Sequence, residues 1–238
     1  MSNNIIFDKV LLKKQNHLIP NNKSLVGMDD EYMMRKDISA VVLAGGNSKR
    51  MGQNKALLKL GERTMIEVIV ENLKPLFSEI IVVTNNSEQY PMLKGVRFAP
   101  DRIQMVEKNS LIGLYTGLWE AKNDCIFVVA CDMPLLNTAL MQYMIENLEG
   151  EDILIPYLEG HYQPLHAIYG KKCLEPMEML LEKGDYKILN FFEKVVVKHI
   201  DEAHVKRFDP YLQSFLNVNN HKEYQDLKER CFDEKSEG

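Results

Sequence analysis

The residues with the clearest chemical use form a cluster of glycines and cations near the start of the chain. Gly45 and Gly46 follow a short apolar run, and Lys49, Arg50 and Lys55 come soon after them. Backbone N–H groups at glycines can approach a ligand closely, because no Cβ atom stands in the way. Lys and Arg side chains neutralise phosphate oxygens. The cluster therefore indicates a nucleotide site, and the alternative is a strand-turn-helix with solvated cations.

A second chemical signal is the carboxylate of Asp132, which follows the apolar run 125–131. A carboxylate at the end of such a run either emerges at the sheet edge or is buried at a large cost in free energy. Mg²⁺ is commonly held by one or two protein carboxylates, with water and substrate phosphate completing its coordination. We therefore expect Asp132 to bind Mg²⁺. The alternative is a helix N-cap, with Pro134 in the turn before the helix.

The elements that must position these residues alternate along the chain. Apolar runs predict strands at 39–43, 80–83, 96–98, 125–131, 153–155, 163–169 and 195–197. Helical spacing predicts helices at 67–73, 111–119, 136–148 and 174–181. This alternation predicts one α/β fold of three layers, Rossmann-like, whose mostly parallel twisted sheet carries helices on both faces. Ligands bind beyond the carboxyl ends of such strands, where the candidate residues lie.

The glycine cluster is neither a Walker loop nor a GxGxxG motif, because Gly52 is followed by Gln53, Asn54 and Lys55. The run 43–58, LAGGNSKRMGQNKALL, resembles the signature loop of the nucleotidyltransferases, most closely that of the molybdenum cofactor guanylyltransferase family. The order of later motifs is also similar: an Asn after the second strand, an Asp before a glycine-containing helix, CDMPLL at 131–136, and an NxN motif at 217–219. The resemblance spans roughly residues 38–228.

The resemblance implies an enzyme that transfers GMP from GTP to the phosphate of molybdopterin, or molybdenum cofactor, with Mg²⁺ as cofactor. Pyrophosphate leaves, and a molybdopterin guanine dinucleotide forms. The nucleotide-binding residues implied are Leu43, Ala44, Gly45, Gly46, Lys55, Asn86, Asp101 and Asp132. Catalytic roles fall to Arg50, Lys55 and Asp132, with the metal on Asp132. Contacts to the second substrate fall to Gln163, Pro164, Asn217 and Asn219.

Several positions allow more than one interpretation. The two asparagines of the NxN motif are either ligands or turn and cap residues ahead of a helix from His221. His161 and His166 are more simply read as ordinary histidines than as metal ligands. Where the family has Gly-Pro, this chain has Asn109 and Ser110, which are good N-caps and make a bulkier loop near the base.

Two other functions compete with guanylyl transfer. A cytidylyltransferase or a sugar-phosphate nucleotidyltransferase shares the fold and the loop. Gly45 favours a purine, because the cytidylyl relatives have alanine there and its methyl group takes space. The other competitor is a non-catalytic nucleotide-binding module in cofactor delivery, suggested by Asn109, Ser110 and the extra N-terminal residues.

Composition narrows the class of protein further. The 238 residues are 45% hydrophobic and 26% charged, which is ordinary for a globular domain, and the net charge of −5 argues against a nucleic-acid surface. The four cysteines form no CxxC pair, and no run resembles a membrane span or a signal peptide, so a cytoplasmic protein is expected. Its partners would be GTP, molybdopterin, and other cofactor-biosynthesis or molybdoenzyme-maturation proteins.

The chain divides into three parts on this interpretation. Residues 1–37 precede the first strand and are expected to be an extension that is at most partly ordered, a packing arm, or the relic of a fusion. Residues 38–230 form one nucleotidyltransferase domain. Residues 231–238 form a frayed tail.

Overall fold

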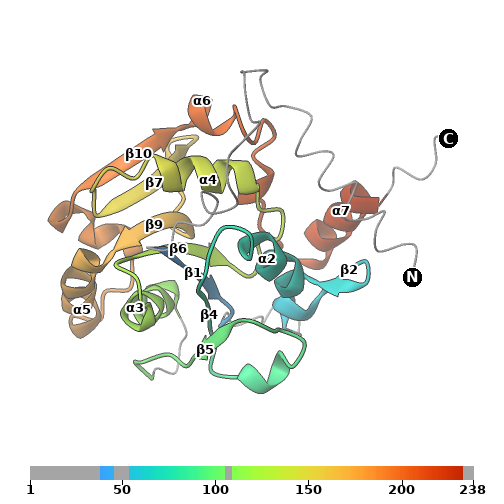
Figure 1. The fold of residues 1–238 in the computed structure, drawn as a ribbon, viewed down its shortest axis with the longest axis horizontal. Coiled ribbons are helices and arrows are strands. Elements are labelled where there is room, and N and C mark those ends of the chain that lie inside the picture. The colour runs from blue at the N-terminus through green and yellow to red at the C-terminus, as the bar shows by residue number, and fades with distance from the viewer. Residues whose placement is uncertain (1–37, 46–53, 105–108, 233–238) are drawn as a thin grey trace.

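The structure is a computed structural model that describes residues 38–45, 54–104 and 109–232, with side chains described up to residue 229. Its main sheet has the strand order β10-β7-β9-β6-β1-β4-β5, with β8 paired to β7 (Figure 1). The strands are β1 (Ile38–Leu43), β4 (Ile80–Val83), β5 (Arg97–Ala99), β6 (Cys125–Ala130), β7 (Ile153–Leu158), β8 (His161–Tyr162), β9 (His166–Gly170) and β10 (Val197–Asp201).

Most strand pairs of the main sheet are parallel, as predicted. β1 lies between β4 and β6 in parallel register, β4 pairs with β5, and β7 pairs with β10 in the same sense. β9 is the exception, because it runs antiparallel to both β6 and β7, and β8 is antiparallel to β7. The mostly parallel α/β fold is therefore confirmed.

Helices cover both faces of the sheet. α2 (Met65–Leu73) and α4 (Thr138–Glu146) pack on one face, and α3 (Ser110–Glu120) and α5 (Leu174–Glu182) pack on the other (Figure 1). Successive residues of β1 point to opposite faces, so Ala40 and Val42 join the first apolar core and Val41 the second. A strand buried on both faces explains why β1 and β6 are apolar at nearly every position.

Smaller elements complete the fold. A two-stranded sheet, β2 (Lys59–Leu60) with β3 (Arg63–Thr64), packs with α2 and α7 (His221–Phe232) around a third apolar cluster. The remaining elements are short: η2 (Lys55–Leu57), η3 (Ser87–Gln89), η4 (Lys171–Cys173), η5 (Ile188–Lys194), α6 (Glu202–Val205) and η6 (Gln213–Phe215). Helix α7 continues to Phe232, so the first two residues of the expected frayed tail are helical.

Several predicted bounds were wrong by a few residues. The strand predicted at 163–169 begins only at His166, because the Gln163 carbonyl accepts a turn hydrogen bond from the His166 amide, 3.1 Å. The helix predicted from residue 136 begins at Thr138, since the Asn137 side chain caps it. The strands predicted at 96–98 and 195–197 lie instead at β5 and β10, shifted toward the C-terminus.

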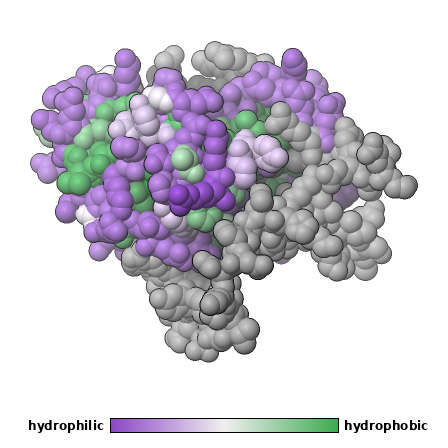
Figure 2. Space-filling view, turned by 90° about the horizontal axis from the view of Figure 1, so that it is seen from above, coloured by the Kyte–Doolittle hydropathy of each residue, from purple (hydrophilic) through white to green (hydrophobic). Residues whose placement is uncertain are grey.

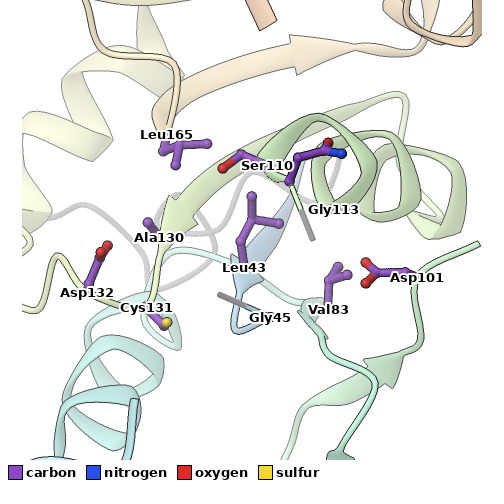
Figure 3. A pocket seen from close by; sticks show the side chains of 11 residues that line it. Leu43, Gly45, Val83, Asp101, Ser110, Gly113, Ala130, Cys131, Asp132 and Leu165 are labelled. Carbon is purple, nitrogen blue, oxygen red and sulfur yellow. The ribbon is translucent and has the colours of Figure 1, made fainter. Parts of the chain in front are cut away.

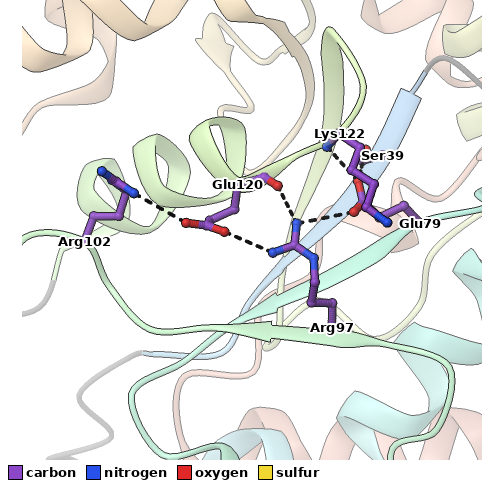
Figure 4. A network of polar contacts seen from close by, with 6 residues as sticks. All are labelled: Ser39, Glu79, Arg97, Arg102, Glu120 and Lys122. Carbon is purple, nitrogen blue, oxygen red and sulfur yellow. Dashed lines mark hydrogen bonds and ion pairs between the residues drawn. The ribbon is translucent and has the colours of Figure 1, made fainter.

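A polar network fastens the amino ends of the central strands (Figure 4). The Glu79 carboxylate, just before β4, accepts hydrogen bonds from the Ser39 hydroxyl of β1 at 2.6 Å and from the Lys122 amide at 3.0 Å. Arg97 of β5 forms ion pairs with Glu79 and with Glu120, the last residue of α3. The network therefore holds the C-terminal end of α3 at the sheet edge opposite the pocket described below.

The surface is mostly hydrophilic on the face seen in Figure 2, with apolar residues in small separate areas. Within the described residues, no helix is long and apolar enough to cross a membrane.

Candidate functional site

A pocket of about 150 Å³ opens at the carboxyl edge of the sheet (Figure 3). It lies beyond the ends of β1, β4 and β6 and against the first turn of α3, which is where ligands bind in open α/β sheets. Its walls are Leu43, Gly45, Val83, Asp101, Asn109, Ser110, Gly113, Ala130, Cys131, Asp132 and Leu165. Four of the predicted nucleotide residues are in this set: Leu43, Gly45, Asp101 and Asp132.

The other predicted nucleotide residues are placed differently. Ala44 is buried next to the pocket, with its amide bonded to the Val83 carbonyl at 3.0 Å. Lys55 is not among the wall residues, but its ammonium lies close to the carboxylate of the wall residue Asp132, as described below. Asn86 is exposed and is not among the wall residues. Gly46, Lys49 and Arg50 lie outside the described residues.

Asp132 stands two residues after β6 with its carboxylate at the pocket edge (Figure 3). Its side chain is 25% exposed, and burial raises the pKa of the carboxyl while the Lys55 ammonium acts to lower it. The N-cap of α4 is Asn137, whose side-chain oxygen accepts from the Leu140 amide at 2.9 Å. The cap interpretation of Asp132 is therefore wrong, and its carboxylate is available to a ligand.

Lys55 and the NxN segment meet at Asp132. The Lys55 Nζ lies 3.8 Å from the Asp132 Oδ2 and donates to the Asn219 Oδ1 at 3.2 Å. The Val218 amide donates to the Asp132 carbonyl oxygen at 2.9 Å, which fixes the segment against the end of β6. A cation, a carboxylate and a carboxamide from three distant parts of the chain are thus gathered at one edge of the pocket.

The three asparagines after η6, Asn217, Asn219 and Asn220, make different contacts. Asn220 accepts from the Glu223 amide at 2.9 Å near the start of α7, so it supplies the helix-capping contact. Asn217 and Asn219 are exposed, and Asn219 contacts Lys55. The side-chain cap therefore comes from Asn220, whereas the Asn219 amide donates to the Glu223 carboxylate at 2.5 Å, so Asn219 belongs to the same turn before α7.

Asp101 on the far side of the pocket is held by Asn85. The Asn85 Nδ2 donates to the Asp101 Oδ2 at 2.9 Å, and the Asp101 amide donates to the Asn85 Oδ1 at 2.8 Å. Asn86 instead begins η3 without a side-chain capping bond. Two adjacent asparagines follow β4, and their position after the strand predicted both of them near Asp101 without showing that Asn85 is the one that contacts it.

The first turn of α3 forms one wall of the pocket. Asn109 caps the helix, since its Oδ1 accepts from the Ile112 amide at 3.0 Å, as expected for this departure from Gly-Pro. One turn on, a Cβ atom added at Gly113 would lie 3.2 Å from the Leu43 Cδ2. Gly113 was not predicted as a site residue, although a glycine inside an apolar helix is a usual signal of close packing.

The predicted second-substrate residues of the β8–β9 turn lie next to the pocket wall. Gln163 and Pro164 are half-buried and not among the wall residues, whereas the next residue, Leu165, is. The Pro164 carbonyl accepts from the Tyr169 hydroxyl at 2.8 Å. His166 is fully buried, and burial lowers its pKa to about 3. Among the described residues no group of three His, Cys, Asp or Glu side chains is arranged to hold a metal.

Cys131 contributes a thiol to the pocket wall (Figure 3). Burial and the neighbouring Asp132 raise its pKa to about 12. A thiol with this pKa stays protonated at neutral pH and is a poor nucleophile. Cys131 is therefore not a candidate for a catalytic nucleophile.

A mostly parallel α/β sheet with a pocket at its carboxyl edge is shared by many enzymes, and the comparisons with known proteins identify this chain as a nucleotidyltransferase. It belongs to the family of MobA-like NTP transferase domains, whose model matches residues 40–202. The "Probable molybdenum cofactor guanylyltransferase" of Natranaerobius thermophilus is 36% identical over 189 residues, which cover 78% of this chain and 92% of that protein. The "Molybdenum cofactor guanylyltransferase" of Desulfosudis oleivorans is 33% identical over 188 residues, 78% of this chain and 92% of that protein.

A solved structure supports the same family. The molybdopterin-guanine dinucleotide biosynthesis protein A of Archaeoglobus fulgidus is 26% identical, with a TM-score of 0.71 over 81% of this chain and 98% of that one. The family expected from the signature loop and the later motifs is therefore confirmed.

Proposed function

We propose that this chain transfers GMP from GTP to the terminal phosphate of molybdopterin or molybdenum cofactor, releasing pyrophosphate and forming a molybdopterin guanine dinucleotide. The observation that carries the proposal is the meeting of Lys55, Asp132 and Asn219 at the pocket edge. The named activity of relatives at 33% and 36% identity supports it.

Asp132 is the residue that would hold Mg²⁺. Its carboxylate is a hard oxygen donor, it is partly exposed at the pocket, and the capping role at α4 belongs to Asn137. One carboxylate fits Mg²⁺, because substrate phosphate and water supply the remaining ligands. The metal, when bound, would neutralise charge on the phosphates. A divalent cation at Asp132 would also relieve the repulsion between this carboxylate and a triphosphate.

Leu43, Ala44 and Gly45 would bind the nucleotide at the end of β1, with Lys55 on its phosphates. Arg50 and Gly46 are proposed as further phosphate contacts, although they lie outside the described residues. Asp101, oriented by Asn85, would accept hydrogen bonds from the nucleoside on the opposite wall. Asn86 stays a predicted nucleotide contact that would require the ligand to extend beyond the pocket walls.

The acceptor would bind near Asn217, Asn219, Gln163 and Pro164. Asn219 contacts Lys55, and Gln163 and Pro164 directly precede the pocket wall residue Leu165. Its phosphate is already an anionic nucleophile, so the protein has to align it with the α-phosphorus of GTP and neutralise the leaving pyrophosphate. The distance of 3.8 Å between the Lys55 Nζ and the Asp132 Oδ2 supports a role of Lys55 in the second task.

The test is pyrophosphate release from GTP, Mg²⁺ and molybdopterin, with CTP as the competing nucleotide. We expect release with GTP and the acceptor together, and little with CTP. Turnover with CTP in place of GTP would favour a cytidylyltransferase. Nucleotide binding without pyrophosphate release under any of these conditions would favour a non-catalytic module. Three further expectations stay predictions. They are a cytoplasmic location, the absence of nucleic-acid binding, and contacts with other cofactor-biosynthesis proteins.

A further inference from the structure

Tyr90 is a buried tyrosine outside the pocket wall whose hydroxyl joins two parts of the site. It follows η3, is 1% exposed, and its ring stacks on Phe98 with the ring centroids 6.3 Å apart. The hydroxyl donates to the Ala44 carbonyl oxygen at 3.2 Å. It also accepts from the Asn54 Nδ2 at 2.9 Å. A phenol that donates to one partner and accepts from another fixes the distance between them.

The Asn54 side chain connects the Tyr90 hydroxyl to η2, the short helix that begins at Lys55. Its Nδ2 also donates to the Gln89 Oε1 at 2.7 Å, so the carboxamide has two acceptors on the segment around η3. Its Oδ1 accepts from the Ala56 amide at 3.1 Å and caps η2, whose first residue is Lys55. The orientation of the Asn54 side chain is therefore tied to the start of η2.

Ala44 provides the rigid end of the connection. Its amide donates to the Val83 carbonyl of β4, and the residue before it, Leu43, accepts from the Cys131 amide beyond β6. The carbonyl that receives the Tyr90 hydroxyl thus belongs to backbone held between two neighbouring strands. Burial raises the pKa of Tyr90, so the phenol keeps the proton that it donates to Ala44.

We propose that Tyr90 is a positioning residue for phosphate binding: through Asn54 it holds Lys55 at a fixed place relative to the end of β1. The inference rests on the proposed role of Lys55 toward GTP. Tyr90 would touch no substrate, because its hydroxyl is buried between Ala44 and Asn54 and it is not among the pocket walls.

The test is Tyr90→Phe, which keeps the ring packing and removes the hydroxyl. We expect the affinity for GTP with Mg²⁺ to fall roughly three- to tenfold, the usual effect of losing one or two hydrogen bonds. The decisive comparison is the same substitution in a Lys55→Ala background. If Tyr90 acts through Lys55, the double variant should bind GTP about as weakly as Lys55→Ala alone. An equal further loss in both backgrounds would overturn the proposal.

Tyr115→Phe is the matched control. Tyr115 is also a buried tyrosine, 4% exposed, and its hydroxyl contacts the Glu178 carboxylate of α5 at 3.2 Å. The same chemical change there should leave GTP affinity at the wild-type value. If Tyr115→Phe weakens binding as much as Tyr90→Phe, the effect is a general loss of packing and the positioning role is wrong.

Hydrogen exchange separates this inference from the proposed activity. Without any nucleotide, the amides of η2 should exchange several times faster in Tyr90→Phe than in the wild type, because the Asn54 cap is no longer held. Unchanged exchange would contradict the contact itself, whatever the wild-type protein does with GTP. If Tyr90→Phe fails to fold, Asn54→Ala removes the bond to the Tyr90 hydroxyl together with the bond to Gln89 and the cap of η2. It should therefore lower the affinity for GTP at least as much, and the loss should show the same dependence on Lys55.

Discussion

The Nζ of Lys55 lies 3.8 Å from the Oδ2 of Asp132, and the two side chains are 17% and 25% exposed. An ion pair at this distance and exposure contributes little to folding, on the order of 1 kcal/mol or less. The arrangement also brings a positive charge beside a carboxylate whose pKa is raised by burial. We therefore interpret the pair as serving ligand binding and not stability: the Lys55 ammonium would bind a phosphate, and the Asp132 carboxylate would bind a metal.

Replacing Lys55 with Ala should weaken GTP binding and slow turnover. A cation that neutralises phosphate in a partly desolvated site contributes on the order of 2 to 4 kcal/mol, which is about 30- to 1,000-fold. Binding is measured by calorimetry with GTP and Mg²⁺, and turnover by pyrophosphate release.

Lys59 is the matched control for this substitution. It lies four residues further on, is exposed, and its Nζ donates to the Glu62 carbonyl oxygen at 2.9 Å. Lys59→Ala should leave affinity and turnover near the wild-type values. If Lys59→Ala were the more damaging change, the cation assigned to the phosphates would be wrong.

Deleting residues 1–36 should leave the melting temperature and GTP turnover close to those of the full chain. The expectation follows from the sheet, which begins at Ile38, and from the pocket, whose walls all come from residue 43 onward. Calorimetric melting and pyrophosphate release compare the two proteins. A loss of several degrees would mean that the segment packs on the core, and the domain boundary proposed at residue 38 would then be wrong.

The central strands could be predicted from the sequence because burial on both faces leaves a continuous apolar run. β4 was predicted with its observed bounds, and β6 differs only by its last residue. The short β2 and β3 were not predicted, since strands of two residues carry too few side chains for a period to appear. β9 was predicted as a strand, but nothing in its side chains distinguishes an antiparallel from a parallel neighbour.

The candidate site could be predicted only in part, because local sequence patterns show which residues follow a strand but not which distant residues contact each other. Position after a strand predicts that Asp101 and Asp132 reach the same edge, and both line the pocket. The contact between Lys55 and Asn219 joins residues far apart in the sequence, and local patterns carry no information on such pairs. The roles of Tyr90 and Asn85 also depend on hydrogen bonds across elements, which only the folded chain shows.

His166 should make the protein less stable as the pH falls. Its two ring nitrogens are buried and have no hydrogen-bond partner within the described part of the chain, and burial lowers its pKa to about 3. The unfolded chain takes up a proton at this side chain near its ordinary pKa of about 6.5, and the folded protein does not. The contribution to stability is therefore present above about pH 6.5 and is lost progressively down to about pH 3.

His166→Leu removes this proton and the unpartnered nitrogens. Between about pH 7.5 and 5.5 the free energy of unfolding of the wild type should fall by about 1.4 kcal/mol more than that of the variant. Urea unfolding at the two pH values measures the difference. Equal pH dependence in both proteins would show that His166 gains a proton in the folded state.

Asp132→Asn is the sharpest test of the metal site, because it keeps the side-chain volume and removes the charge. Asn137 caps α4, so the melting temperature without ligand should change little. GTP binding should lose its dependence on Mg²⁺, and kcat should fall by at least about 100-fold, the effect of removing one strong electrostatic contact in the transition state. Asp101→Asn is the comparison, since Asp101 lies in the same pocket but is bonded to Asn85. That variant should bind GTP more weakly while keeping the response to Mg²⁺. An Asp132→Asn protein with near-normal turnover at low Mg²⁺ would remove Asp132 from the mechanism.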